Sequence, residues 1–404
     1  MIVGATLAVA LYAQRNPRSG RTQGPPLQEN MPKILEVKNL RITFPVKGQP
    51  APAVDGISFH LDQGKVLGLV GESGCGKTVT ALSLLKLIEK PGQIAEGHAF
   101  YHGEVPGLSA PRVSPEEIAK SGEEPSEATP VNPILLEQSR REPTAEVQAE
   151  KLPEAGGIDL YRLSDEEMRK IRGHKIAMIF QEPMTSLNPV FTVGDQIEEA
   201  VRLHQGVGKK EAQEIAIEML RKVRIPDPEK RIHDYPHQLS GGMRQRVMIA
   251  MALSCKPDIL IADEPTTALD VTIQAQILQL MKELIDEMHM SVILITHDLG
   301  VVAEVCDDVI VMYSGMIVER APAKRLFRKP KHPYTIGLLQ SIPPLFKDSG
   351  ESLHTIKGMV PDLSRIPPGC RFAPRCPRAV EACRGRIPPF KYVGEGQEVR
   401  CLNY

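Results

Sequence analysis

The sequence has few aromatic residues: tryptophan is absent, and phenylalanine and tyrosine bring the aromatic share to only 4% of 404 residues. Surfaces that bind single-stranded nucleic acid rely on stacked aromatic rings, so this composition argues against such a surface. An excess of positive charge is also missing, because 49 lysines and arginines stand against 50 aspartates and glutamates. The chain therefore has no long-range electrostatic attraction to nucleic acid.

No apolar run reaches the ~20 residues that a membrane-spanning helix needs. The opening stretch MIVGATLAVALYA, residues 1–13, is apolar but too short, and it lacks the basic leader of a signal peptide. Met31 begins the stretch MPKILEVKNLRITFP, which has the pattern of a domain start. Two interpretations stay open: Met31 is the true initiator, or the first residues form a loose N-terminal extension that touches a membrane.

From residue 34 onward, short apolar runs alternate with segments of helical periodicity, which predicts a mostly parallel sheet covered on both faces. Ser164 and Glu167 predict a capping box. Residues 104–157 are rich in proline and glutamate and predict a disordered insertion. Strands are expected at 34–44, 57–61, 65–70, 175–180, 258–263 and 291–296, a hairpin at 307–320, and helices at 77–88, 193–223, 242–253, 271–289 and 297–305.

A glycine-rich loop, GESGCGKT at Gly71–Thr78, joins one expected strand to the following helix. Its glycines let the backbone turn N–H groups toward phosphate oxygens, Lys77 supplies positive charge to the β and γ phosphates, and the Thr78 hydroxyl can ligate Mg²⁺. A plain glycine turn is the alternative, which the flanking strand and helix disfavour. The candidate ATP-binding residues here are Gly71, Ser73, Gly74, Cys75, Gly76, Lys77, Thr78 and Val79.

The stretch ILIADE, residues 259–264, is an apolar strand that ends in two adjacent carboxylates. Asp263 is the candidate Mg²⁺ ligand, and Glu264 is the candidate group that polarises the attacking water. Taken alone, the pair would be read as a polar strand end entering a loop. With the phosphate loop upstream, it predicts ATP hydrolysis that depends on Mg²⁺.

The stretch LSGGMRQR, Leu239–Arg246, places Ser-Gly-Gly at the start of a helix, where free N–H groups and the helix dipole favour an anion. With this stretch in place, the chain resembles the ATP-binding subunits of ABC transporters. The resemblance implies a dimer in which the signature residues of one chain contact the γ-phosphate of ATP held by the other. Those residues are Ser240, Gly241 and Gly242.

Four further positions match the pattern of that family. Gln181 in IFQEP resembles the glutamine that reaches Mg²⁺ and water and relays movement to the membrane subunits. His297 in LITHD resembles the switch histidine at the γ-phosphate, and Asp270 in TTALD resembles the aspartate at the dimer seam. Phe44 resembles the aromatic residue that stacks on adenine, although it fits a core position equally well. Cys75 stands where the family has a small residue, which predicts sensitivity to oxidants.

Within ABC proteins, the chain resembles the oligopeptide/dipeptide importer group over residues 32–103 and 158–404. Its GGMRQRVMIAMAL and IADEPTTALD stretches are similar to the first of that group's two ATPase types, since the second type usually has Gln at the position of Met243 and DEPVSALD. The resemblance implies an ATP hydrolase that powers import of di- or oligopeptides. The other stretches that carry it are FQEPMTSLNPV and KHPYTIGLLQSIP.

The resemblance also implies partners: a second, similar ATPase subunit, two transmembrane permeases docked near Gln181 and Pro183–Pro189, and an extracytoplasmic substrate-binding protein, with no nucleic acid. The chain would lie peripherally on the cytoplasmic face of the membrane. Another cargo, such as nickel or glutathione, stays open because the ATPase does not touch cargo. A soluble ABC ATPase of translation or DNA repair is a remote alternative, since such proteins carry tandem nucleotide domains or a long coiled coil.

The fold class implied is α/β, with a P-loop NTPase core of the RecA-like type and an antiparallel β subdomain. A helical subdomain would carry the signature, and a small, loop-rich region with four cysteines would end the chain. The expected boundaries are an N-terminal extension at 1–31, an ABC ATPase nucleotide-binding domain at 32–330 with the disordered insertion at 104–157, and a C-terminal oligopeptide-transporter-type region at 331–404.

Four of the seven cysteines lie in this last region, with the spacing Cys370-x5-Cys376-x6-Cys383-x17-Cys401. A loop-rich segment with little apolar surface needs a cross-link or a metal to fold. Disulfides are disfavoured inside the cell, and zinc sites usually show C-x₂₋₄-C pairs. The resemblance implies a [4Fe–4S] cluster, while zinc or free thiols stay open. Five arginines lie in the same stretch, and they would either offset the negative charge of a four-thiolate cluster or form a solvated basic face. They are Arg371, Arg375, Arg378, Arg384 and Arg386.

Overall fold

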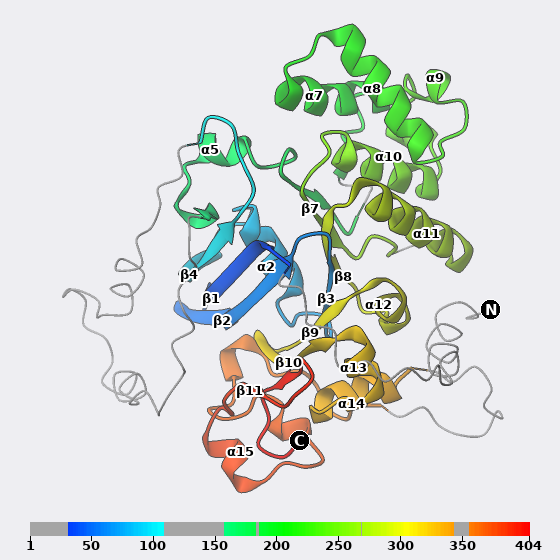
Figure 1. Ribbon diagram of the computed structural model, residues 1–404. Coiled ribbons are helices and arrows are strands. Elements are labelled where there is room, and N and C mark those ends of the chain that lie inside the picture. Colours follow the sequence, from blue (N-terminus) through cyan, green and yellow to red (C-terminus); the bar gives the residue numbers. More distant parts are fainter. Residues whose placement is uncertain (1–30, 109–156, 183–185, 268, 343–354) are drawn as a thin grey trace, which may run out of the picture.

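The computed structural model describes residues 31–108, 157–182, 186–267, 269–342 and 355–404. These parts of the chain form an eight-stranded and a four-stranded β-sheet with helices packed against them (Figure 1). The expected extension at 1–31 and most of the expected insertion at 104–157 lie outside the described residues. Both remain predictions.

The middle of the larger sheet consists of parallel strands in the order β9–β3–β8–β7–β6. Every residue of β3, β6, β7 and β8 is buried, as expected for parallel strands covered on both faces. The predicted strands are therefore confirmed. Their bounds are β3 (Val66–Val70), β6 (Ile176–Ile179), β7 (Ile259–Asp263), β8 (Ser291–Ile295) and β9 (Asp308–Tyr313).

Side chains along these strands alternate between two hydrophobic clusters, one on each face. In β7, Leu260 and Ala262 belong to the cluster formed with the large helices, whereas Ile259 and Ile261 belong to the cluster formed with the smaller sheet and α2 (Lys77–Leu84). The parallel sheet therefore lies between a helical layer and an antiparallel layer. Helix α2 is shorter than the predicted 77–88 because Lys86 takes a left-handed φ of 51°.

The smaller sheet is antiparallel, with the strand order β2–β1–β4–β5. It confirms the predicted strands at 34–44 and 57–61 and adds β4, which the sequence did not reveal. Just after β5, the predicted capping box joins Ser164 and Glu167 at the start of α5 (Asp165–Arg169). The strands are β1 (Lys33–Val46), β2 (Gln49–Asp62), β4 (Gln93–Tyr101) and β5 (Ile158–Asp159).

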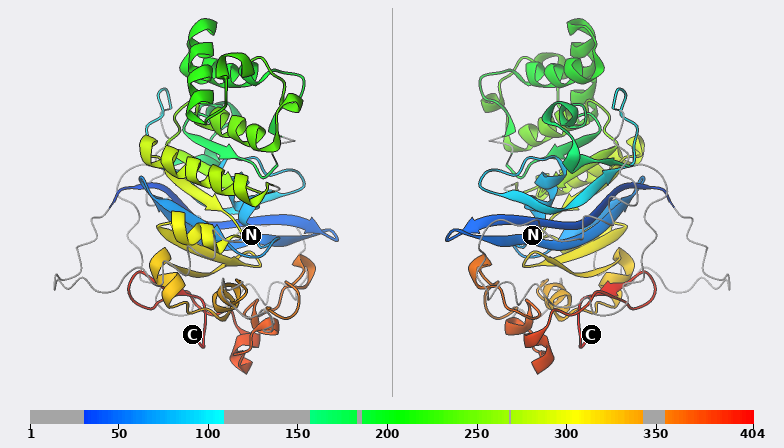
Figure 2. Two further views of the ribbon diagram at one scale, coloured as in Figure 1. Left: turned by 90° about the vertical axis from the view of Figure 1, so that its right-hand side faces the viewer. Right: turned by 90° about the vertical axis from the view of Figure 1, so that its left-hand side faces the viewer.

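A helical region is inserted between β6 and β7 and stands at the top of both views in Figure 2. It starts at a capping box between Thr192 and Asp195, and its helices pack on the parallel sheet through the first hydrophobic cluster. None of the helices in the described parts of the chain has the length and apolar character that crossing a bilayer requires. The helices are α7 (Val193–Gln205), α8 (Lys209–Lys222), α9 (Pro228–Arg231) and α10 (Gly241–Leu253), followed after β7 by α11 (Val271–Met288) and after β8 by α12 (Leu299–Val305).

The C-terminal part of the chain lies at the opposite end, below β9 and β10 in Figure 1. The predicted hairpin at 307–320 is confirmed as β9 and β10 (Met316–Pro322). Strand β12 (Glu398–Val399) pairs with β10 and extends the large sheet, and β11 (Lys391–Tyr392) pairs with β12. The connecting helices are α13 (Ala323–Arg328), α14 (Pro333–Gln340) and α15 (Glu381–Gly385).

Candidate functional site

The loop Gly71–Thr78 leaves the carboxyl end of β3 and leads into α2. Gly71 has a φ of 151°, and a Cβ at this position would lie 2.2 Å from the carbonyl oxygen of Met312. Gly76 has a φ of 102°, and a Cβ there would lie 2.8 Å from the carbonyl oxygen of Ala53. Both positions therefore require glycine, which supports the tight phosphate-binding turn predicted from the sequence.

The ammonium group of Lys77 lies against this loop. It donates hydrogen bonds to the carbonyl oxygens of Gly71 (2.8 Å) and Glu72 (3.1 Å). The lysine ammonium group is a point charge on a flexible side chain, so it can exchange these two carbonyl acceptors for phosphate oxygens. Around it, Ser73 and Gly74 are exposed, and Thr78 and Val79 are half-buried.

Asp263 ends β7 and is only 1% exposed. Burial raises the pKa of its carboxyl group, and a hydrogen bond with Thr78 opposes that rise. Its Oδ1 atom has no hydrogen-bond partner among the described residues. A buried carboxylate oxygen without a partner, next to a threonine hydroxyl, fits the oxygen ligands that Mg²⁺ prefers.

Three side chains converge on one carboxylate oxygen of Glu264. Gln181 donates to Oε2 at 3.2 Å, the Thr267 hydroxyl donates at 2.8 Å, and Nδ1 of His297 lies 3.4 Å away. The structure thus brings Gln181, Glu264 and His297 together, because β6, β7 and β8 are parallel and end at one edge of the sheet. Thr267 was not anticipated, although it stands within the TTALD stretch.

Glu264, Thr267 and His297 line an open cleft of about 700 Å³, within the size range of small-molecule sites. Gly71 and Glu72 form one side of it, and Glu264 and His297 form another. The signature residues Ser240, Gly241 and Gly242 are not among its lining residues. They lie close to it, since a Cβ at Gly241 would be 3.8 Å from Leu269, which lines the cleft.

The signature opens α10. The Ser240 side chain caps this helix by accepting a hydrogen bond from the Met243 N–H (3.3 Å), and Ser240 and Gly241 are exposed. Asp270 caps α11 in the same way, accepting from the Ile273 N–H at 3.0 Å, and it is also exposed. Both helix starts are therefore accessible to another molecule.

Two residues predicted to bind ATP, Phe44 and Cys75, pack against the rest of the protein. Phe44 is half-buried and packs against the turn at Gly92, where a Cβ would come within 2.5 Å of its ring. This contact supports a core role, and its adenine contact stays a prediction. Cys75 is fully buried, and burial raises the pKa of its thiol. The raised pKa argues against the oxidant sensitivity expected from the sequence, because the thiolate is the reactive form.

The four C-terminal cysteines affect one another electrostatically and form no disulfide. Burial raises the pKa of Cys370 to about 11, and the neighbouring Cys383 and Cys376 thiols add to the shift. The pKa of Cys376 and that of Cys401 are raised by burial and by nearby thiols, with Arg378 opposing. Among the described residues, however, no three His, Cys, Asp or Glu side chains gather as ligands of one metal ion.

Two of the five arginines in this region contact the ATPase core instead of forming a solvated basic face. Arg371, whose side chain is 4% exposed, pairs with Asp55 and donates to the Ser314 carbonyl. Arg375 donates to both carboxylate oxygens of Glu72 in the phosphate loop. The other three are exposed: Arg378, Arg384 and Arg386. The sequence carried one signal of this contact: Glu72 is a carboxylate inside an anion-binding loop, which suggests a basic partner elsewhere in the chain.

Comparison with protein families gives two matches. Residues 54–127 and 144–267 match the ABC transporter family, and residues 318–383 match the family described as the oligopeptide/dipeptide transporter C-terminal region. The second match covers β10, the helices that follow it and three of the four C-terminal cysteines. Both matches agree with the two regions seen in the structure.

Curated proteins match along most of their length. A putative peptide import ATP-binding protein of Brucella ovis is 46% identical over 377 residues, covering 92% of this chain and 97% of that protein. The oligopeptide transport ATP-binding protein AppD of Bacillus subtilis is 45% identical over 375 residues, covering 93% and 98%. Among solved structures, the dimeric bacterial ABC transporter cassette MJ0796 aligns with a TM-score of 0.53 at 24% identity, covering 72% of this chain and 98% of that one, which shows the shared fold.

Proposed function

Because the chain belongs to the ATP-binding subunits of oligopeptide/dipeptide ABC importers, we propose that it hydrolyses ATP to power the uptake of peptides. The observation that carries the proposal is the convergence of Gln181, Thr267 and His297 on Glu264, beside a phosphate loop. The peptide cargo follows from the C-terminal region and from relatives that are named for peptide import.

ATP binding uses the loop Gly71–Thr78. Its backbone N–H groups and the start of α2 hold the phosphates, and Lys77 exchanges its bonds to the Gly71 and Glu72 carbonyls for the β and γ phosphates. Thr78, Asp263 and Gln181 are the residues that would hold Mg²⁺, which neutralises charge on the phosphates when bound.

Hydrolysis needs a water molecule oriented toward the γ-phosphate. Glu264 is the acceptor for that water's proton or its orienting group, and its Oε2 is held by Gln181, Thr267 and His297. These three contacts restrict the carboxylate to one orientation, so little reorganisation remains at the moment of reaction. His297, with its side chain 68% exposed, is free to reach the γ-phosphate.

ABC transporter ATPases act as dimers on permeases, and the exposure of Ser240, Gly241 and Asp270 supports that arrangement here. Ser240, Gly241 and Gly242 cap the γ-phosphate of ATP bound to the partner, and Asp270 lies at the seam. We take the partner to be a second, similar ATPase, as in the first of the group's two subunit types. The chain is then peripheral on the cytoplasmic face, below two permeases fed by an extracytoplasmic binding protein.

Coupling to the permeases runs through Gln181 and the segment that follows it. Gln181 bonds Glu264 on one side and continues into Pro183–Pro189 on the other. Residues 183–185 of that segment lie outside the described residues, while the neighbouring Val190 and Phe191 are exposed apolar side chains. An exposed apolar surface beside the hydrolysis site suits a docked membrane subunit.

The cysteine region holds a [4Fe–4S] cluster in this proposal, with Cys370, Cys376, Cys383 and Cys401 as ligands. What supports the cluster is the donor chemistry: nearby thiols contribute to the raised pKa values of Cys370, Cys376 and Cys401, and a bound cationic centre would favour their thiolate forms. Among the described residues the cysteine side chains do not converge as ligands of one metal ion, so zinc stays the alternative to the cluster.

The cluster is tested by purifying the full chain without oxygen and measuring iron, acid-labile sulfide and zinc. About four irons and four sulfides per chain, with cluster absorption in the visible spectrum, are expected. Zinc alone, or no metal in a folded protein that binds ATP, would overturn the cluster.

The function is tested by deleting the gene in its host and measuring uptake of a labelled tripeptide. The wild-type chain should restore uptake, and Lys77→Ala should not. Unchanged peptide uptake, together with lost uptake of nickel or glutathione, would contradict the peptide assignment and leave the ATPase role intact.

A further inference from the structure

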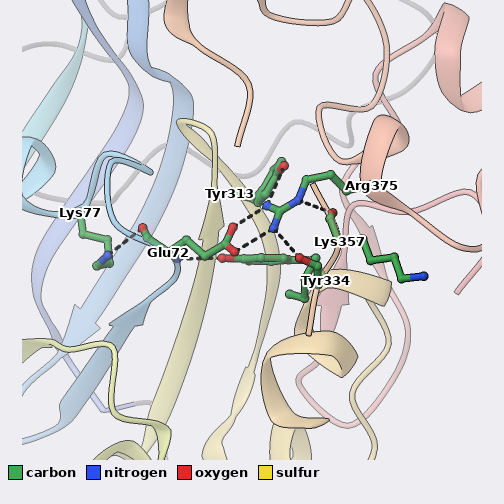
Figure 3. A network of polar contacts seen from close by, with 7 residues as sticks. Glu72, Lys77, Tyr313, Tyr334, Lys357 and Arg375 are labelled. Carbon is green, nitrogen blue, oxygen red and sulfur yellow. Dashed lines mark hydrogen bonds and ion pairs between the residues drawn. The ribbon is translucent and has the colours of Figure 1, made fainter. Parts of the chain in front are cut away.

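From the cysteine-containing part of the C-terminal region, Arg375 reaches the phosphate loop (Figure 3). Its guanidinium donates to Glu72 Oε2 at 2.6 Å and to Oε1 at 3.0 Å. Arg375 ends a 3₁₀ turn (Ala373–Arg375) directly before Cys376 and therefore belongs to the cysteine region. This bidentate pair joins residues 303 positions apart in the chain.

Glu72 is the second residue of the loop and lines the cleft. Its backbone N–H donates to the Tyr334 hydroxyl at 2.8 Å, and its carbonyl accepts from Lys77. A carboxylate at this position is electrostatically unfavourable, because the loop and the start of α2 attract anions and ATP brings several negative charges. Its charge needs a partner on the side away from the phosphates.

Arg375 is built to be that partner. Its side chain is only 5% exposed, and Nε donates to the Lys357 carbonyl (3.1 Å) while Nη2 donates to the Ile356 carbonyl (3.3 Å). Its guanidinium also lies 5.8 Å from the ring centre of Tyr313 and donates to the Tyr313 hydroxyl. These contacts hold the planar guanidinium group in one orientation. Arg375 therefore pairs with Glu72 without losing further side-chain entropy.

We propose that Arg375 is a positioning residue for ATP binding, which neutralises and orients Glu72 so that the phosphate loop accepts the nucleotide. The inference rests on the proposed role of Gly71–Thr78 as the phosphate loop. It makes the cysteine region a clamp on the nucleotide site, since any rearrangement around Cys376 moves its neighbour Arg375. The pair lies beside the loop and takes no part in the reaction, so binding should change more than the chemical step.

The test measures equilibrium binding of Mg·ATP and Mg·ADP to the full chain, purified without oxygen. Arg375→Met should weaken both nucleotides by about tenfold, because an unpaired Glu72 then repels the phosphates and the loop loses its support. Arg375→Lys, which keeps the charge but not the fork, should lose about threefold. The loss should shrink at high salt, where the repulsion is screened.

The decisive variant is the double change Glu72→Gln with Arg375→Met. If Arg375 acts by neutralising Glu72, removing the carboxylate should restore affinity to within about threefold of wild type. Equal weakening in the single and double variants would mean that Arg375 acts only on folding, and would overturn the proposal. Unchanged affinity in Arg375→Met would overturn it as well.

Two further variants separate this inference from its surroundings. Arg325→Met removes another pair at the same region, with Glu395 (2.7 Å) and Gln397 (3.0 Å), without touching the loop, and should leave affinity unchanged. Loss of affinity in this control equal to that in Arg375→Met would overturn the specific role. Lys77→Ala should abolish binding, and if it does while Arg375→Met binds normally, the phosphate site stands and the clamp alone fails.

Discussion

Two parts of the molecule position their functional side chains in different ways. One is the edge of the large sheet that carries Gln181, Glu264 and His297, and the other is the C-terminal region, residues 355–404. At the sheet edge, the backbone determines where the side chains lie. Gln181, Glu264 and His297 follow three adjacent parallel strands, and they meet because those strands end together. In the C-terminal region the described helices and strands are short, and side chains add attachments to the backbone pairing of β12 with β10.

Those attachments are mostly charged groups bonded to the core. Arg371 reaches Asp55, Arg375 reaches Glu72, and the amide of Gln397 reaches the buried Glu319. A sheet edge tolerates many substitutions, because backbone hydrogen bonds hold it. A region that relies on ion pairs beside a short strand pairing is sensitive to single changes in those pairs, and it can transmit a change in its own structure to the site it touches.

The largest effect is expected at the sheet edge. Glu264→Gln should lower the ATP hydrolysis rate by at least about 100-fold, because the amide cannot accept the proton of water. ATP binding should persist, since the phosphate loop is intact, and the variant should trap bound ATP. Glu287→Gln, which changes an exposed carboxylate paired with Lys222, is the control and should hydrolyse normally. Normal hydrolysis by Glu264→Gln would remove this residue from its role.

The next effect tests how the C-terminal region is attached. Glu319 is fully buried and accepts from the Lys331 N–H (2.7 Å), the His332 N–H (2.9 Å) and the Gln397 amide (2.7 Å). Glu319→Ala removes the acceptor of all three hydrogen bonds and should lower the free energy of unfolding by about 3 kcal/mol. Urea unfolding measures the change. A loss below about 0.5 kcal/mol would mean that the backbone holds this region after all.

A smaller effect is expected on how the free energy of unfolding depends on pH, through His332 at the start of α14. Burial lowers the pKa of His332, the N-cap of α14, to about 3. Between the ordinary value of about 6.5 and this value, the unfolded chain binds a proton that the folded chain does not. Stability should therefore fall as the pH is lowered through this window, by up to about 1.4 kcal/mol per pH unit from this group.

The matched variant is His332→Asn, which retains a side-chain acceptor for the Tyr334 N–H. Urea unfolding at pH 7.5 and at pH 5.5 should show a smaller loss in the variant than in the wild type, by about 1 kcal/mol. His60, whose pKa burial lowers to about 4, keeps its own share of the pH dependence in both proteins. Identical pH dependence would show that His332 does not titrate as its burial requires.

The smallest effect joins the two regions. Cys376→Ser should weaken ATP binding by about twofold, because it loosens the segment that carries Arg375. The same change made on top of Arg375→Met should have no further effect on affinity. An equal twofold loss in both backgrounds would mean that the cysteine acts on the nucleotide site by a route other than the pair with Glu72.

Much of the sheet edge could be predicted from the sequence. Apolar runs such as 259–263 and 291–295 are buried strands, and the polar residues that follow them had to meet if the strands were parallel and adjacent. The C-terminal attachments could not be predicted, because no periodicity links Arg375 to a residue in the phosphate loop. Strand β12 was missed for a similar reason: two residues carry no alternation that a pattern can detect.

The sequence by itself determined the nucleotide loop, the buried parallel strands, the carboxylate that ends β7 and the family to which the chain belongs. These features depend on local periodicity and on residues close together along the chain, where steric and hydrogen-bonding rules act directly. Only the tertiary structure decided that Cys75 is buried and that Arg375 pairs with Glu72. Both depend on contacts between distant segments, and the free energy of such contacts is set by the burial and geometry that the whole fold creates.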